Sequence, residues 1–459
     1  MKKLLPSLLL ICSTQLHSQL TTAEDYFKSA LKHDANHEIK TALEHYTKAI
    51  ELNPNFTEAY KKRGLLKGFK GNYKSAIDDL KLAIKLNPNR ANTYVTKGNL
   101  ERQLSNTTIA LQDYNKAIEI RSNYADAYLH RGIVYQELNK VSDAFESYNA
   151  AINLNPSIPD SYYHRGNLHE SQSNIKKAID DYSKAFELSQ THLPAIIGRA
   201  NLKAKTNDFN GAISDFTTAI EIAENDMLYL RRGSVKAKVK DYLGAKEDYT
   251  LAIKINPNNA KAYSRRGFIK YKLENFKYAI IDYNSAIELE PELASSFYNR
   301  AHCYIKLQNH EKAIQDLSNT IKLDPKNANA HFYRAKQKEK LENFEGAAVD
   351  YYLAFELTKK HSNALSRSAE LKRKLKDYKG AVKDYTKSIE LDQKKDIYLQ
   401  RKTLKIELQD FKGAIEDYSK VIEFNSELKS NSLSNEITNQ IEKRLDSSHR
   451  TENITAKVF

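Results

Sequence analysis

Small and apolar residues recur at three- and four-residue spacing in short segments along most of the chain. In one such segment, 262–273 (AYSRRGFIKYKL), the residues at this spacing are Tyr263, Gly267, Tyr271 and Leu273. Because an α-helix completes one turn in about 3.6 residues, this spacing brings the four side chains to one face. The segment is therefore predicted to be an amphipathic helix.

A second segment of the same kind follows after a short break. In 279–289 (AIIDYNSAIEL), the residues on one face are Ala279, Tyr283, Ala286 and Leu289. The break is LENF, and the stretch EPEL after the second segment places Pro291 where a helix should stop, because proline lacks the N–H that continues a helix. The two segments predict a helix–turn–helix unit.

This unit is repeated along the chain with a nearly constant period. An alanine marks the beginning of each second helix: Ala42, Ala76, Ala110, Ala144, Ala178, Ala212, Ala245, Ala279, Ala313, Ala347, Ala381 and Ala414. The step is 34 residues, except from Ala212 to Ala245 and from Ala381 to Ala414, where it is 33. Both short steps fall between one unit and the next, where a loop can lose a residue without turning either helix.

Two columns of the repeat indicate how the units pack. The column of Gly267 holds a small residue in every copy but that of Lys402: Ala30, Gly64, Gly98, Gly132, Gly166, Ala200, Gly233, Ala301, Ala335 and Ala369. A small residue lets two helices approach closely, and a bulky column fills the space beside it: Tyr114, Tyr148, Tyr182, Tyr249 and Tyr283. Since no unit can bury both faces alone, we expect the units to stack into a linear array of about two dozen helices.

The 34-residue pattern of aromatic, small residue, alanine, aromatic, alanine and proline resembles the tetratricopeptide repeat (TPR) family. The resemblance covers residues 23–426 in about twelve copies, although the proline column lapses at Ser122, Gln190 and Glu224. It implies an all-α solenoid, a right-handed superhelix of helix–turn–helix units with a concave groove that binds a peptide or a partner protein. Terminal copies are less regular, as capping units often are.

The two ends of the chain differ from the repeats. Lys2 and Lys3 precede an apolar stretch that is too short to span a bilayer, so residues 1–18 are predicted to be a secretory signal peptide, followed by the array at 19–426. The protein is then expected to be exported, to a periplasmic or cell-envelope setting or outside the cell. Lipidation of Cys12 is the weaker interpretation, because the preceding Ile11 is large.

The last segment, 427–459, is predicted to be a polar linker, a capping helix and a frayed tail. The expected helix carries apolar residues four apart: Leu433, Ile437, Ile441 and Leu445. After signal cleavage, Cys303 would be the remaining cysteine, which leaves no intramolecular disulfide. No other apolar run is long enough to cross a membrane.

Composition is that of a folded, basic protein. Apolar residues make up 41% and charged residues 28% of the chain, and the formal charge is +14. A positive charge favours acidic partners, but acidic residues are interleaved almost everywhere. The 29 tyrosines fall mostly in the packing columns and so give no stacking platform for nucleic acid.

The most regular charged feature is an arginine beside the small residue of most units: Arg63, Arg131, Arg165, Arg199, Arg232, Arg266, Arg300, Arg334 and Arg401. An aspartate follows 16 residues later in most copies: Asp79, Asp181, Asp215, Asp248, Asp282, Asp316, Asp350 and Asp417. The arginines would either bind a ligand or form internal ion pairs that fix the register of the helices. The internal interpretation is favoured, because a charge at a packed seam needs a partner and one is present.

A second column is a lysine in six consecutive units: Lys205, Lys238, Lys272, Lys306, Lys340 and Lys374. In the TPR family this position faces the concave groove, so the row would hold an acidic or extended peptide. The alternative is that these lysines are simply solvated, since a single exposed charge contributes little.

A third candidate is a site for a peptide carboxylate. Some TPR proteins hold a C-terminal carboxylate with five groove residues on three successive repeats. Asn201, Lys261 and Arg265 match three of those places, whereas Ile197 and Arg231 replace the lysine and asparagine of the family pattern. With twelve repeats to sample, a partial match of this kind also arises by chance.

No motif for catalysis or cofactor binding stands out. His33 and His37 have helical i,i+4 spacing, but no third metal ligand is fixed, and His130 and His164 simply repeat one column. The expected function is therefore a non-enzymatic scaffold or adaptor without metal or cofactor. The alternative function is an accessory of envelope polymer machinery that binds anionic polysaccharide through the lysine row. Partner identity and oligomeric state stay open.

Overall fold

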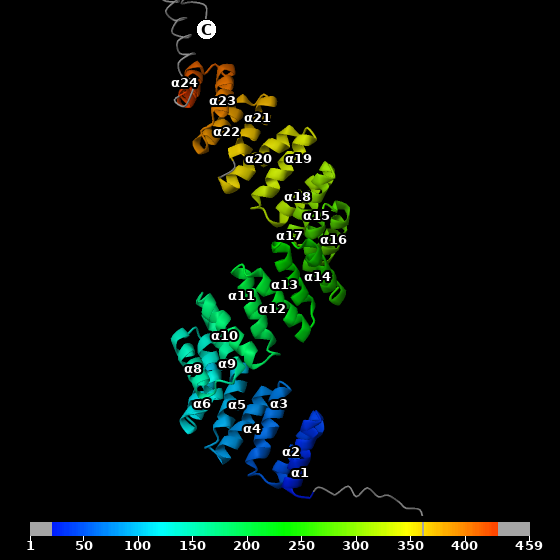
Figure 1. Ribbon diagram of the computed structural model, residues 1–459, viewed down its shortest axis with the longest axis vertical. Coiled ribbons are helices and arrows are strands. Elements are labelled where there is room, and N and C mark those ends of the chain that lie inside the picture. Colours follow the sequence, from blue (N-terminus) through cyan, green and yellow to red (C-terminus); the bar gives the residue numbers. More distant parts are fainter. Residues whose placement is uncertain (1–20, 360–361, 430–459) are drawn as a thin grey trace, which may run out of the picture. The chain divides into compact units, whose positions relative to one another are not determined.

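The computed structural model describes residues 21–359 and 362–429 (Figure 1). The predicted signal peptide, Cys12 and the predicted capping helix of the tail lie outside the described residues. The chain divides into two compact units, Met1–Glu224 (unit 1) and Asn225–Phe459 (unit 2). The elements in the described residues of both units are α-helices, 24 in all, paired as about twelve helix–turn–helix repeats.

Unit 1 contains six helix pairs. Their bounds are α1 Ala23–Ala35, α2 Ile39–Leu52, α3 Thr57–Phe69, α4 Tyr73–Leu86, α5 Ala91–Gln103, α6 Thr107–Ile120, α7 Ala125–Glu137, α8 Val141–Leu154, α9 Pro159–Ser171, α10 Ile175–Leu188, α11 Leu193–Lys205 and α12 Phe209–Ile222. Odd-numbered helices are called first helices below and even-numbered ones second helices.

Unit 2 contains the other six pairs. Their bounds are α13 Asp226–Lys238, α14 Tyr242–Ile255, α15 Ala260–Lys272, α16 Phe276–Leu289, α17 Ala294–Lys306, α18 His310–Leu323, α19 Ala328–Lys340, α20 Phe344–Thr358, α21 Ser362–Lys374, α22 Tyr378–Leu391, α23 Lys395–Glu407 and α24 Phe411–Lys429. The last helix therefore continues three residues past the predicted end of the array.

The predicted pattern of helices and turns is confirmed, with one shift. The repeated alanine is the fourth residue of each second helix, so these helices begin three residues before it, as α16 does at Phe276. The extra turn is stabilised by caps: Asp241 Oδ1, for example, accepts a hydrogen bond from the Gly244 N–H at 3.0 Å. Both 33-residue steps correspond to three-residue loops, 223–225 and 392–394, as expected.

The small and bulky columns pack together as predicted. The repeated alanines and tyrosines of the second helices are almost fully buried. A Cβ atom added to Gly267 would lie 3.0 Å from Tyr283 Cε1, and one added to Gly98 would lie 2.7 Å from Tyr114 Cε1. Absence of a side chain at the small position is thus what lets the tyrosine ring lie flat against the neighbouring helix.

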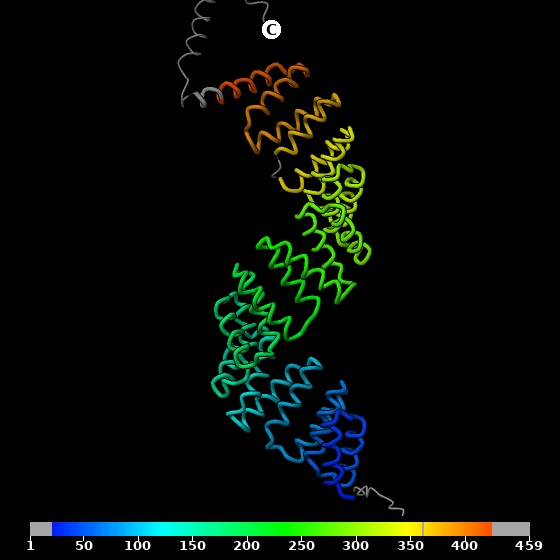
Figure 2. Tube along the Cα trace, turned by 45° about the vertical axis from the view of Figure 1, so that its right-hand side comes forward, coloured from blue at the N-terminus to red at the C-terminus, as the bar shows by residue number. Residues whose placement is uncertain are grey.

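First helices form the inner wall of each unit. Within each unit, each pair packs on the next along the chain (Figure 2), and first helices of successive pairs also touch: α3 with α5, α5 with α7, α7 with α9, α9 with α11, α13 with α15, and α15 with α17. Because helices are closest together on the inside of a curve, the surface presented by the first helices is the concave one.

Within residues 21–359 and 362–429, none of the helices combines the length and the apolar character needed to cross a bilayer. Cys303 lies in α17 and is fully buried against Ala279 and Tyr283. Burial raises the pKa of its thiol to about 12, so the thiol is protonated at neutral pH.

Candidate partner-binding groove

The arginines of the column form internal ion pairs, which confirms the favoured prediction, except that Arg131 donates to Ser147 Oγ and Asn115 Oδ1 instead. In α15, the Arg266 Nε and Nη2 atoms donate to Asp282 Oδ2 and Oδ1 at 3.0 and 2.8 Å. Arg266 Nη1 donates to Thr250 Oγ1 on the preceding second helix at 3.3 Å. The Lys270 ammonium lies 2.7 Å from Asp282 Oδ2. One arginine therefore ties its own two helices to the previous repeat.

The same geometry recurs in both units. Bidentate pairs join Arg63 with Asp79, Arg165 with Asp181, Arg199 with Asp215, Arg232 with Asp248, Arg266 with Asp282, Arg300 with Asp316, Arg334 with Asp350, and Arg401 with Asp417. We call this set the ionic ladder. Burial alone would raise the pKa of Asp350, but hydrogen bonds from His331, Arg334 and Lys338 outweigh it and hold that pKa below its usual value.

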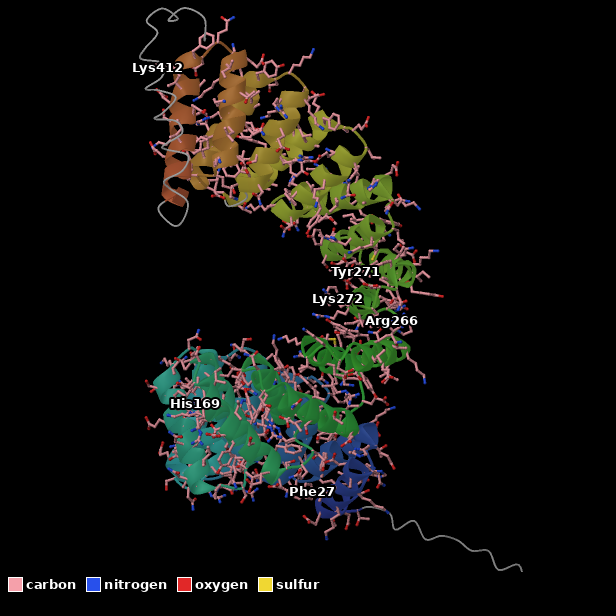
Figure 3. All side chains as sticks on the ribbon, turned by 45° about the horizontal axis from the view of Figure 1, so that its top comes forward. Phe27, His169, Arg266, Tyr271, Lys272 and Lys412 are labelled. Carbon is pink, nitrogen blue, oxygen red and sulfur yellow. The ribbon has the colours of Figure 1, made fainter. Side chains whose placement is uncertain are left out.

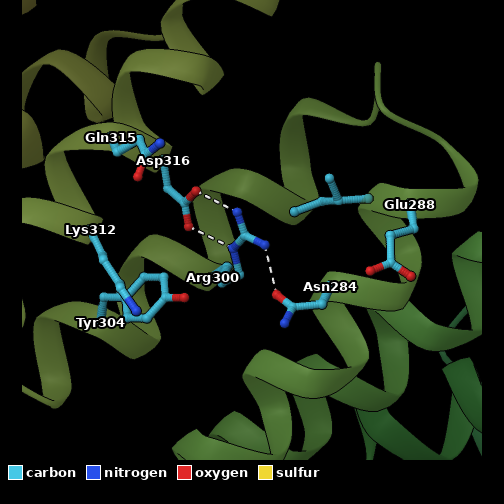
Figure 4. A pocket seen from close by; sticks show the side chains of 8 residues that line it. Asn284, Glu288, Arg300, Tyr304, Lys312, Gln315 and Asp316 are labelled. Atoms are coloured by element: carbon cyan, nitrogen blue, oxygen red, sulfur yellow. Dashed lines mark hydrogen bonds and ion pairs between the residues drawn. The ribbon is translucent and has the colours of Figure 1, made fainter.

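The ladder has gaps where its lysine is replaced. Tyr304 stands at the lysine position beside Arg300, and a side pocket of about 350 Å³ opens between α16, α17 and α18 (Figure 4). His169 takes the same position beside Arg165 and borders a similar pocket of about 420 Å³. In both places the aspartate pairs with its arginine but has no lysine at that position as a second partner. These pockets therefore result from the replacement of the ladder lysine.

A larger pocket, of about 630 Å³, lies on the first helices of unit 2. Its walls include Lys238 from α13, Lys261, Arg265 and Phe268 from α15, and Asn299 from α17. Lys261 and Arg265 are exposed, and none of the residues that line this pocket is acidic. The pocket therefore offers three cations to an anionic group. We call it the basic pocket.

A smaller pocket of about 180 Å³ shares Phe268 and Asn299 with the basic pocket. Its other walls are Tyr271, Tyr283 and His302. Burial lowers the pKa of His302, which favours the neutral ring, so the walls are mainly aromatic and uncharged. We call it the aromatic pocket.

Models of repeat families match more than half of the chain. A "TPR repeat" model matches residues 98–139 and 134–173, and two "Tetratricopeptide repeat" models match 159–192 and 294–327, and 57–90, 228–259, 260–293 and 362–395. The chain belongs to the tetratricopeptide repeat family. TPR domains generally mediate protein–protein interactions, and the family is typically non-enzymatic.

Several solved TPR structures are similar to parts of this TPR protein. YrrB, described as a TPR protein with an unusual peptide-binding site, is 26% identical, with a TM-score of 0.36 over 40% of this chain and 95% of its own. A TPR protein from Parabacteroides merdae is 22% identical over 54% of this chain and 98% of its own, with a TM-score of 0.37. The C-terminal part of a TPR protein from Cytophaga hutchinsonii is 20% identical over 51% of this chain and 96% of its own, with a TM-score of 0.45. No curated protein matches the chain.

The lysine row occupies equivalent places in the TPR repeats. Each lysine is the last residue of a first helix and is exposed: Lys205, Lys238, Lys272, Lys306, Lys340 and Lys374. Lys272 lies at the inner margin of the helices of unit 2 (Figure 3), with its ammonium 5.2 Å from the centroid of the Phe268 ring. A cation at the end of a helix also interacts favourably with the helix dipole, so this placement has a structural cause besides any ligand.

The residues of the predicted carboxylate site divide between the two units. Ile197 and Asn201 lie on α11 in unit 1, whereas Arg231, Lys261 and Arg265 lie on α13 and α15 in unit 2. Of the matching residues, Lys261 and Arg265 come together, at the basic pocket. Carboxylate binding by the five residues stays a prediction.

Sequence reasoning missed the aromatic pocket. Tyr271 was assigned to the face of an amphipathic helix and Tyr283 to a packing column, and Phe268 was not singled out. A signal was present, because the positions of Phe268 and Tyr271 carry polar residues in several other repeats, such as Asn99 and Gln136. Only the arrangement of α15 and α17 turns this departure into a pocket.

The suggested histidine pair does not form on one helix. His37 lies in the turn after α1, with a φ of 60°, whereas His33 lies in the helix and its Nδ1 is 2.6 Å from Glu38 Oε2. Among residues 21–359 and 362–429, no group of three His, Cys, Asp or Glu side chains is placed to hold a metal ion. Burial lowers the pKa values of His130 and His164 to about 4, so this column is neutral at pH 7.

Proposed function

We propose that this TPR protein is a non-enzymatic scaffold or adaptor that binds a segment of a partner protein on the first helices of unit 2. The observation that carries the proposal is the basic pocket with the aromatic pocket beside it, on α13, α15 and α17. Concave sites with apolar walls and a few polar or charged groups are typical of ligand recognition. The family to which the chain belongs supports a protein as the ligand.

Binding would follow from a surface that is formed before the partner arrives. The ionic ladder and the buried tyrosines hold the first helices at fixed spacing, so little ordering free energy is lost when a peptide binds. Exposed cations and aromatic rings along the helices would each add a small contribution to the binding free energy. Affinity would therefore depend on how many repeats the partner contacts.

A charge-reversal experiment tests the proposal. Lys272, Lys306 and Lys340 are changed together to glutamate, and both chains are used to capture proteins from the envelope fraction of the source cells. We expect the wild type to capture a defined partner. The triple variant should capture at least tenfold less of that partner. Unchanged capture would remove the groove from consideration.

The matched control carries the same charge change on second helices. Lys254, Lys277 and Lys322 are exposed residues of α14, α16 and α18, and their triple change to glutamate should leave capture intact. If the wild type captures no protein but binds alginate in a salt-sensitive way, and the groove variant loses that binding while the control keeps it, the polysaccharide alternative replaces the proposal.

We also propose that the chain is exported, on the strength of its N-terminal sequence. Expression of the full chain in a bacterial host, followed by N-terminal sequencing of the protein from the envelope or periplasmic fraction, tests this. A mature chain that begins close to residue 19 is the expected result. A cytoplasmic product that retains Lys2 and Lys3 would contradict it.

A further inference from the structure

The hydroxyl of Tyr283 differs from those of the equivalent tyrosines. In other repeats the hydroxyl donates to a polar side chain on the first helix, 12 or 15 residues earlier. The pairs are Tyr114 with Asn99, Tyr148 with Gln136, Tyr182 with Asn167, and Tyr351 with Glu339, at 2.7 to 3.0 Å. The corresponding residues for Tyr283 are Phe268 and Tyr271, and its buried hydroxyl has no hydrogen-bond partner among the described residues.

The contrast with Tyr385 shows why this position is special. The Tyr385 hydroxyl also has no partner among the described residues, but the two helix positions facing it hold Glu370 and Arg373, which are polar. At Tyr283 both positions are aromatic. A buried hydroxyl without a partner is destabilising, and a ligand that supplies an acceptor would recover much of that loss.

Tyr283 lies in the wall of the aromatic pocket, whose rings suit an apolar group. At about 180 Å³ the pocket is smaller than sites for whole drug-sized ligands, which are about 300–1,000 Å³, so it suits one side chain. Phe268 at its rim is 39% exposed, which leaves the ring available for contact. A large apolar side chain would therefore cover Phe268 and Tyr271 as it enters.

The basic pocket adjoins this site and fixes the charge of the ligand. Lys261 and Arg265 are four residues apart on α15, so both side chains lie on one face of that helix. With Lys238 they surround a space that no carboxylate lines, and Lys272 adds a further cation over Phe268. An anionic group beside an apolar one is the arrangement that satisfies both pockets at once.

We propose that the groove of unit 2 selects an acidic peptide segment with a large apolar residue between its carboxylates. The carboxylates bind at Lys261 and Arg265, the apolar side chain enters the aromatic pocket, and a carbonyl oxygen of the peptide accepts a hydrogen bond from Tyr283. This inference rests on the proposed function and specifies the chemistry of its ligand.

Three synthetic probes test the selectivity by fluorescence anisotropy with the full chain. The first is a labelled decapeptide with one phenylalanine flanked on each side by two acidic residues. The second has alanine in place of phenylalanine, and the third has lysine in place of every acid. We expect the first to bind at least tenfold more tightly than the second, and the third not to bind.

Tyr283→Phe tests the role of the hydroxyl. It should weaken binding of the first peptide about three- to tenfold while leaving the melting temperature unchanged or higher, because it removes only an unpaired buried group. A hydroxyl with a purely structural role would lower the melting temperature instead. The matched control, Tyr148→Phe in unit 1, removes a paired hydroxyl and should leave peptide binding unchanged.

Arg265→Glu tests the basic pocket, with Lys322→Glu on α18 as its control. We expect Arg265→Glu to weaken binding of the first peptide at least tenfold and Lys322→Glu to leave this binding unchanged. Equal binding of the phenylalanine and alanine peptides, or of Tyr283→Phe and wild type, would overturn the inference. So would failure of all three peptides to bind, even where envelope capture through Lys272, Lys306 and Lys340 upholds the proposed function.

Discussion

The middle residue of every turn within a repeat adopts a left-handed backbone conformation. All twelve have φ between 56° and 81°, but only Gly71 is a glycine; the others are His37, Ser105, Asn139, Ser173, Asn207, Lys240, Glu274, Gln308, Glu342, Lys376 and Gln409. A residue with a Cβ atom loses about 1–2 kcal/mol in this conformation, because the Cβ approaches the following carbonyl oxygen. The turns therefore keep their geometry at a local energetic cost.

Glu274→Gly should relieve this cost. Glu274 has a φ of 61° in the turn between α15 and α16, and glycine adopts that angle readily. We expect the free energy of unfolding of unit 2 to rise by about 1 kcal/mol, measured by urea unfolding. Lys383→Gly, at an exposed position inside α22, should lower it by a similar amount. A loss of stability in Glu274→Gly would contradict the steric argument.

The histidine column makes unit 1 sensitive to acid. Burial lowers the pKa values of His130 and His164 from 6.5 to about 4, so the unfolded chain binds more protons between these values. Stability is therefore present above about pH 6.5 and is lost as the pH falls towards 4, by up to about 3 kcal/mol for each histidine. The double variant His130→Phe/His164→Phe should lose less stability than wild type between about pH 7 and about pH 4.5 in urea unfolding. Equal losses in both chains would show that carboxylates alone set the acid sensitivity.

At the scale of the helix, the ionic ladder fixes how elements meet. Arg266, for example, contacts the second helices α14 and α16 and lies on α15 between them, so its side chain sets the spacing of three elements. Buried ion pairs add little net stability compared with apolar packing, but removal of one partner leaves the other charge buried and unpaired. The ladder is therefore expected to matter most for the register of the helices.

Asp282→Ala should show this asymmetry. Arg266 and Lys270 would both lose their partner, and we expect the free energy of unfolding to fall by about 3–5 kcal/mol. The control is Asp78→Ala, where the exposed pair with Lys81 is 3.8 Å apart and should be worth at most about 1 kcal/mol. Similar losses in the two variants, measured by urea unfolding, would argue against the ladder as a buried structural device.

The sequence was sufficient to predict these elements but not the pockets. Helix pairs follow from a period that Ala279 and its equivalents repeat, and the ladder follows from a fixed spacing of 16 residues. Starts of second helices were placed three residues late, because capping residues such as Asp241 carry no apolar pattern. The aromatic pocket escaped prediction because it depends on the contact between α15 and α17, which no single helix encodes.

At the scale of the whole chain, the two units share one construction rule. Within each unit, packing is between a helix and its near neighbours along the sequence. Stability of such an array is approximately a sum of repeat and nearest-neighbour contributions, so damage in one repeat should stay local.

Gly267→Leu tests this locality. The added side chain would collide with Tyr283, whose Cε1 atom is 3.0 Å from a Cβ at this position. We expect α15, α16 and α17 to lose amide hydrogen-exchange protection, while α3 to α8 keep theirs. Gly267→Ala should have a smaller effect, since alanine occupies the same column beside a tyrosine at Ala335, which packs with Tyr351. A uniform loss across both units would mean that the chain unfolds as one cooperative body.

Labelling of the Cys303 thiol can measure local opening of α17. Cys303 is buried against Tyr283, which also lines the aromatic pocket, and the raised pKa of its thiol keeps it unreactive while α17 stays packed. An alkylating reagent can reach the sulfur only when α17 opens transiently. The rate of thiol labelling therefore reports the rate of local opening of this helix. A ligand bound in the aromatic pocket should lower the labelling rate of the Cys303 thiol. Labelling of this native cysteine would therefore report whether the pocket is occupied.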